Sequence, residues 1–147
     1  MSRQFDTRKT RIGDIVETNA AKFPDNIAMA YHEYGFKNSF TEFRDICKQV
    51  AKGLMALGVG RNDHFAMWAN NVPEWIYTQF GSAMMGGVMV TVNTNFRAFE
   101  LEYLLSQSDS NTLILTDGVR EPDEYIEIVN QVLPELKDCA PGALESE

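Results

Sequence analysis

The stretch that decides the fold runs from residue 70 to residue 109 and begins Asn70-Asn71-Val72-Pro73-Glu74-Trp75. A helical pattern of small and apolar residues follows and ends at Met84-Met85-Gly86-Gly87. Next come an apolar run at 88–92, the sequence Asn93-Thr94-Asn95-Phe96-Arg97, and a second helical pattern that includes Glu100-Leu101-Glu102-Tyr103-Leu104-Leu105. A glycine pair ends a helix, and a short apolar run suits a buried strand. The stretch therefore predicts a helix, a strand and a second helix.

The alternation continues on both sides of this stretch. Short apolar runs predict strands at 65–69 and 112–116. A last helix is expected from about Pro122, kinked or broken at Pro134. Asn71 and Glu74 have the spacing of a capping box, with Pro73 in the first turn of its helix. Short apolar strands separated by helices favour parallel pairing with right-handed crossovers. We therefore expect an α/β fold with a three-layer, Rossmann-like parallel sheet that is incomplete.

Residues 1–61 predict a different arrangement, namely a helix, a β-hairpin and a second helix. Thr10 is expected to cap the first helix, whose apolar stripe is Ile12, Ile15, Val16 and Phe23. Ser39 and Glu42 form a capping box for the second helix, and Gly58 ends it. The sequence thus divides into this N-terminal part (1–61), a βαβαβα unit (62–138) and a short tail (139–147).

Composition and charge exclude several classes of protein. The net charge of −8 argues against non-specific nucleic-acid binding. The charge is uneven, because residues 1–61 carry ten Lys and Arg against seven Asp and Glu, whereas residues 62–147 carry three against fourteen. Cys47 and Cys139 match no metal or redox spacing, so we expect two reduced thiols. No secretory signal is visible in residues 1–11, and the apolar stretch 80–92 is too short for a membrane span. These features predict a soluble cytoplasmic protein.

The block at 70–109 resembles the acyl-CoA synthetases of the adenylate-forming (AMP-binding) superfamily. Those enzymes have an N-x-P-E-W helix, a Gly-rich turn into a strand, a V-N-x-N-[FY]-R corner and an E-L-x-Y-L-L helix. The resemblance extends more loosely from about Thr10 to the end of the sequence. It implies that residues 1–147 are the N-terminal part of the large domain of a ligase of fatty acid metabolism. Such an enzyme uses ATP and Mg²⁺ to adenylate a carboxylic acid and then transfers the acyl group to CoA.

The resemblance also shows which family motifs this sequence lacks. The family holds ATP phosphates with a loop of the form [ST]-[ST]-G-[ST]-[ST]-G-x-P-K, and the sequence contains no Ser-Gly, Thr-Gly or Pro-Lys pair. The adenine and ribose motifs and the family's C-terminal lysine are also missing. We therefore expect no catalytic residue in this chain, no activity by the chain alone, and the remainder of the enzyme as its partner. The alternative is a non-catalytic module that self-associates through an unpaired sheet edge. An unrelated receiver domain is disfavoured because Asp117 stands alone.

Arg97 is the one candidate for ligand binding. It is the first of three basic residues in 62–147 and follows the end of a predicted strand, where α/β proteins bind ligands. The resemblance implies that an arginine at this corner can lie close to the adenosine phosphate of CoA. The alternative is that Arg97 pairs with Glu100 on the next helical turn.

Other polar and aromatic residues have simpler interpretations. We expect His32 and His64 to have strand-end roles and Ser82 to pack within a helix. Four acidic residues open the last helix, where negative charge suits the helix dipole, with a metal site as a remote alternative: Glu121, Asp123, Glu124 and Glu127. Four aromatic residues are expected in the core, with an acyl pocket as the alternative: Trp68, Trp75, Tyr77 and Phe80. The sequence predicts no metal site.

Overall fold

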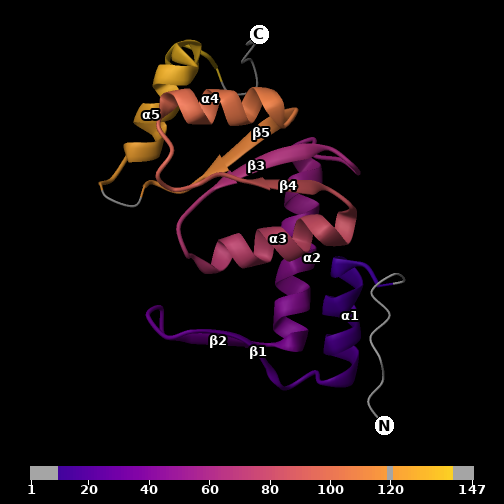
Figure 1. Ribbon diagram of the computed structural model, residues 1–147. Helices are drawn as coiled ribbons and strands as arrows, with labels where there is room; N and C mark the ends of the chain where they lie inside the picture. The colour runs from indigo at the N-terminus through magenta and orange to yellow at the C-terminus, as the bar shows by residue number, and fades with distance from the viewer. Residues whose placement is uncertain (1–9, 119–120, 141–147) are drawn as a thin grey trace. The chain divides into compact units, whose positions relative to one another are not determined.

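A computed structural model describes residues 10–118 and 121–140, and in it the chain forms two compact units. Of the described residues, the first unit contains 10–63 together with Val72–Val88. The second unit contains His64–Asn71 and the described residues 89–118 and 121–140. Figure 1 shows the elements of both units along the chain.

The first unit consists of three helices and an antiparallel hairpin. The helices are α1 (Ile12–Lys22), α2 (Phe40–Ala56) and α3 (Pro73–Met85), and the hairpin pairs β1 (Ile27–Tyr31) with β2 (Phe36–Ser39). Val16, Phe43, Cys47 and Tyr77 form its buried core. The predicted helix, hairpin and helix are therefore confirmed for the N-terminal part of the chain.

Two glycines allow the helices of this unit to approach closely. A Cβ atom at Gly13 of α1 would lie 2.7 Å from the Cα of Met84 in α3. A Cβ atom at Gly81 of α3 would lie 2.8 Å from the carbonyl oxygen of Cys47 in α2. Both distances are shorter than real Cβ atoms show, so α3 packs backbone against backbone with both neighbours.

These contacts also correct the apolar stripe predicted for α1. Its buried residues are Gly13, Val16 and Ala20, whereas Ile12 and Phe23 are 55% and 50% exposed. The face with small residues turns inward because it allows the closest approach to α3.

The helix ends agree with the sequence at three positions and differ at two. The Ser39–Glu42 capping box is confirmed, and Gly58 and Gly86 follow α2 and α3 with φ angles of 94° and 87°. The predicted cap at Thr10 is wrong, since Arg11 is the N-cap of α1 and its N–H donates to Asp14 at 3.1 Å. The predicted Asn71–Glu74 box is also wrong, because Val72 is the N-cap of α3. Pro73 disfavours helical geometry in the residue before it, so the helix cannot begin earlier.

The second unit contains a three-stranded parallel sheet with two helices. The sheet order is β4 (Val88–Thr91), β3 (His64–Trp68) and β5 (Ser110–Leu115). β3 pairs in parallel with β5. The N–H groups of Val88 and Val92 donate to the carbonyls of Asp63 and Met67, which gives β4 the same direction. The predicted α/β fold with a parallel sheet is confirmed.

Helices α4 (Ala98–Gln107) and α5 (Glu124–Val132) share a core with the sheet. At its centre the ring of Trp68 stacks on Tyr125, with a 4.0 Å centroid distance and a 15° interplanar angle. The predicted break at Pro134 is confirmed, because α5 stops at Val132 and a short 3-10 helix, η1 (Pro134–Lys137), follows. None of the described helices has the length and apolarity needed to cross a membrane.

Candidate functional site

The candidate site lies in the second unit, at the carboxyl edge of the parallel sheet (Figure 1). Chain segments leave the sheet here after Trp68 of β3, after Thr91 of β4 and after Leu115 of β5. The N–H of Thr116 donates to the carbonyl of Trp68 at 3.1 Å, which extends the pairing of β3 and β5 to this edge. Ligands of open α/β sheets bind at the carboxyl ends of strands. The side chains at this edge are therefore the first to be considered for ligand binding.

The turn after β4 is fixed by the carbonyl oxygen of Asn93. That oxygen accepts a hydrogen bond from the indole Nε1 of Trp68 at 3.1 Å and another from the N–H of Phe96 at 3.0 Å. The side-chain oxygen of Asn93 also accepts from the N–H of Asn95 at 2.9 Å. Since Trp68 is fully buried, the turn is attached to the core and holds Arg97 in one place.

Arg97 is the N-cap of α4, and its carbonyl oxygen accepts the first helical hydrogen bond, from the N–H of Leu101 at 3.0 Å. Its backbone N–H donates to the carboxylate of Glu100 at 3.0 Å. Its guanidinium Nη1 lies 3.4 Å from Oε1 of Glu124, the first residue of α5. The expected pairing with Glu100 thus occurs through the backbone, whereas the side chain pairs with a residue 27 positions away.

The guanidinium of Arg97 remains accessible to a ligand. Its side chain is 58% exposed, and its one ion pair with Glu124 is long. The side chain of Glu124 is only 16% exposed, but solvent screens the exposed guanidinium and the contact is long, so an anionic group can compete with Glu124. A guanidinium suits phosphate because its planar donors can bind two oxygens at once. The arrangement can bind a phosphate or carboxylate group, which would compete with the carboxylate of Glu124 for the guanidinium.

The other polar residues singled out in the sequence occupy positions that the fold itself explains. His64 opens β3, and its Nδ1 lies 2.6 Å from the carbonyl oxygen of Ser108. His32 is exposed in the hairpin turn. Ser82 is buried within α3, and its hydroxyl donates to the carbonyl of Gln79 at 3.0 Å. Across residues 10–118 and 121–140, no group of three or more His, Cys, Asp or Glu could hold a metal ion.

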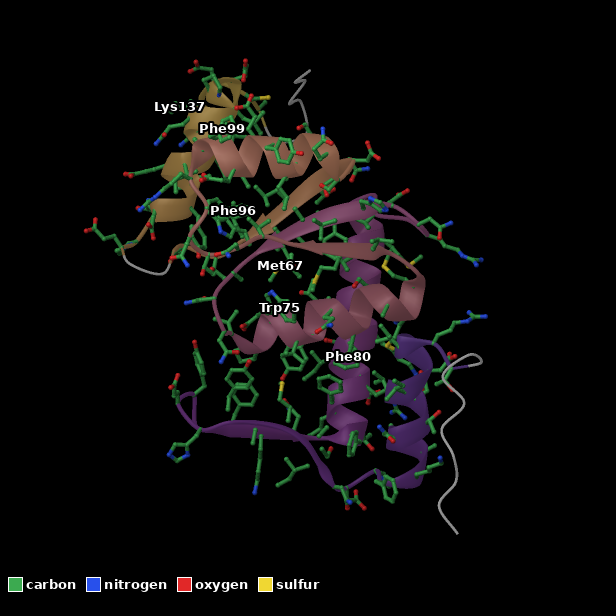
Figure 2. All side chains as sticks on the ribbon, viewed as in Figure 1. Met67, Trp75, Phe80, Phe96, Phe99 and Lys137 are labelled. Atoms are coloured by element: carbon green, nitrogen blue, oxygen red, sulfur yellow. The ribbon has the colours of Figure 1, made fainter. Side chains whose placement is uncertain are left out.

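A second concave region, in the first unit, is apolar. It is a cavity of about 290 Å³ whose lining includes Ile76, Phe80 and Tyr31 and contains no charged side chain. Burial is the main reason that the pKa of the Tyr31 phenol is raised, so this group stays neutral. Phe80, labelled in Figure 2, is half-buried like Trp75, whereas Trp68 and Tyr77 are buried as expected for core residues. This largely apolar cavity suits an apolar group, and its described lining offers a phosphate no cationic side chain.

A third hollow in the first unit is polar, and its lining includes Arg11, Arg61 and Asp14. Arg61 lies against Gly86, the C-cap of α3, because a Cβ atom at Gly86 would be 3.1 Å from its Cγ. A cation at a helix C-terminus stabilises the helix dipole. Arg61 therefore has a structural reason to be there.

Comparison with known proteins gives consistent matches along most of the chain. Residues 16–144 match the family described as AMP-binding enzyme. The chain is 46% identical over 136 residues to YngI of Bacillus subtilis, described as an acyl-CoA synthetase, covering 92% of this chain and 25% of that protein. It is 30% identical over 138 residues to the mouse mitochondrial medium-chain acyl-CoA ligase ACSF2, covering 94% of this chain and 22% of that protein.

Solved structures match in the same way. A protein from Rhodopseudomonas palustris, described as a long-chain-fatty-acid CoA ligase, has a TM-score of 0.73 and 27% identity, covering 86% of this chain and 30% of that chain. The N-terminal subdomain of NpsA from Klebsiella oxytoca, in complex with anthranilyl-AMSN, has a TM-score of 0.67 and 25% identity, covering 73% and 27% respectively. The chain thus spans about a quarter of the length of the curated relatives it matches.

Proposed function

The chain belongs to the AMP-binding enzyme family, and we propose from this that it forms the N-terminal segment of the large domain of an ATP-dependent acyl-CoA synthetase. Such an enzyme joins a carboxylic acid to AMP and then transfers the acyl group to the CoA thiol. The observation that carries the proposal is 46% identity, across 92% of this chain, to a protein described as an acyl-CoA synthetase. We place the enzyme in the cytoplasm as part of the same proposal.

In this proposal the chain supplies scaffold and leaves the chemistry to the remainder of the enzyme. Its sequence has no Ser-Gly, Thr-Gly or Pro-Lys pair, which the family's phosphate loop requires. The described residues also contain no group of three or more His, Cys, Asp or Glu that could hold a metal ion. ATP and Mg²⁺ would therefore be bound by residues of the remainder, and the chain alone would not catalyse the reaction.

Arg97 is the residue of this chain that we propose contacts a substrate. An exposed guanidinium at the carboxyl edge of the sheet fits the adenosine phosphate of CoA. The anchored turn at Asn93 supports this role, because it holds the arginine without using its side chain.

The experiment is a chimera in which this chain replaces the matching segment of the Bacillus subtilis relative. We expect the chimera to form acyl-CoA and the isolated chain to show no ATP–pyrophosphate exchange. Arg97→Ala in the chimera is expected to raise KM for CoA roughly three- to tenfold, the size of one exposed charge-assisted contact, with KM for ATP unchanged. Arg61→Ala is the matched control, because Arg61 is an exposed arginine of the first unit. An unchanged KM for CoA would remove Arg97 from the site, and a folded but inactive chimera would refute the proposed function.

The second candidate is a non-catalytic module that self-associates. Among the described strands of the parallel sheet, β4 and β5 are edge strands, and unpaired edges tend to pair with another chain. Sedimentation of the isolated chain separates the two candidates. A stable dimer together with an inactive chimera would favour the module.

A further inference from the structure

We propose that the outer face of α4 is a docking surface for the remainder of the acyl-CoA synthetase, an inference that rests on the proposed function. Phe99 and Tyr103 are the large hydrophobic residues of this face, and they are 78% and 62% exposed. They are four residues apart and therefore lie side by side on one face of the helix. Phe96, which precedes the helix, and Phe99 are labelled in Figure 2. Below, "the aromatic face" means Phe96, Phe99 and Tyr103.

The aromatic face borders a groove rather than a flat surface. The groove has a volume of about 360 Å³, and besides the aromatic face its lining includes Glu100, Leu104, Gln107 and Ser108. The exposed rings of Phe99 and Tyr103 are not part of the core of the second unit, against which α4 packs through the fully buried Leu101. Large exposed aromatic side chains that rim a groove are typical of binding surfaces.

The length of the relatives identifies the occupant. This chain spans 25% and 22% of the two curated relatives, so about three quarters of such an enzyme is available to cover the groove. The rim carries a negative charge, because among the described residues Glu100 lines the groove and no Lys or Arg does. The complementary surface on the remainder is therefore apolar at its centre and basic at its edge.

A second copy of the chain fits the groove less well. Two copies would bring Glu100 near its own equivalent, and each carries a net charge of −8. The two exposed rings offer roughly 250 Å² together, whereas a stable dimer buries about 800 Å² on each partner. An area of that size suits one part of a larger interface within a single enzyme.

The test measures access to the aromatic face in two settings, the isolated chain and the chimera with the Bacillus subtilis relative. In a Cys139→Ser background, Phe99→Cys is labelled with a maleimide, and Glu102→Cys on the same helix, outside the groove lining, is the matched control. Cys47 is fully buried and does not interfere. We expect the chimera to slow labelling at position 99 at least tenfold relative to the isolated chain, with little change at position 102.

Each other outcome contradicts the inference. Equal labelling of position 99 in a chimera that forms acyl-CoA would overturn the docking surface and leave the proposed function intact. Protection at position 99 in the isolated chain that increases with its concentration would assign the groove to a second copy. A folded chimera that forms no acyl-CoA would refute the proposed function, whatever the labelling shows.

Discussion

Gly81→Ala is expected to destabilise the chain although alanine is the better helix former. Gly81 lies inside α3, where replacing Gly by Ala alone would stabilise by about 0.5–1 kcal/mol. The new Cβ would lie 2.8 Å from the carbonyl oxygen of Cys47 and 3.1 Å from Cγ1 of Val50. Overpacking of this kind costs about 1–3 kcal/mol, and the carbonyl belongs to the backbone of α2 and cannot rotate away. The net expectation is a loss of about 1–2 kcal/mol.

Gly53→Ala is the matched control for this change. Gly53 lies inside α2, and a Cβ atom there would meet nothing within 4 Å. For 147 residues the unfolding entropy makes 1 kcal/mol equal to about 3 °C in Tm. Thermal unfolding followed by circular dichroism should therefore show Gly53→Ala about 2–3 °C above the wild type and Gly81→Ala about 3–6 °C below it. If Gly81→Ala melted at or above Gly53→Ala, the backbone contact between α2 and α3 would be refuted.

Two further predictions concern the core of the first unit. Burial raises the pKa of the Cys47 thiol from 9.0 to about 12, so the folded chain should release one equivalent of thionitrobenzoate rapidly, from Cys139, and the second only on unfolding. The fold favours the neutral thiol, so the contribution of Cys47 to the free energy of unfolding is fully present below pH 9. It is lost as the pH rises from 9 to about 12, at up to ~1.4 kcal/mol per pH unit. Urea titrations at stepped pH should show a shallower decline for Cys47→Ala, and parallel curves would contradict the assignment. Tyr77→Phe removes the hydroxyl that donates to Oδ1 of Asn38 and should cost about 1 kcal/mol in the same assay. Tyr34→Phe, at a tyrosine that is 54% exposed, should change stability by less than about 0.5 kcal/mol, and equal effects of the two changes would argue against the bond.

The elements could be predicted because their signals are local. Gly58 and Gly86 end helices through their own positive φ angles, and Ser39 and Glu42 satisfy each other across one turn. Such rules need no knowledge of the rest of the chain. The inward face of α1 could not be predicted in the same way, because it depends on α3, which begins about 50 residues after α1 ends. Hydrophobicity favoured Ile12 as the buried residue, and close approach at Gly13 selected a different face.

The candidate site was predictable in its place and only partly in its contacts. The end of a strand in a parallel fold indicated the carboxyl edge, and Arg97 lies there. Its ion pair with Glu124 joins two helix starts that no sequence spacing relates. The hydrogen bond from Trp68 to Asn93 was missed for the same reason, since a buried tryptophan indicates packing and says nothing of its indole partner.

The contacts of Arg97 bear on whether its side chain serves the fold or a ligand. The fold uses its backbone N–H, which caps α4 by donating to Glu100, and any residue except proline supplies that group. The turn before it is held by Asn93 and Trp68 and does not involve the guanidinium. Its contact with Glu124 is long at 3.4 Å, and solvent screens it on the arginine side, which is 58% exposed, although the side chain of Glu124 is 16% exposed. Within the stretch 70–109, the fold explains the presence of Pro73, Gly86 and Asn93. It explains the guanidinium of Arg97 only weakly, and this contrast supports a role of that group in binding an anionic ligand.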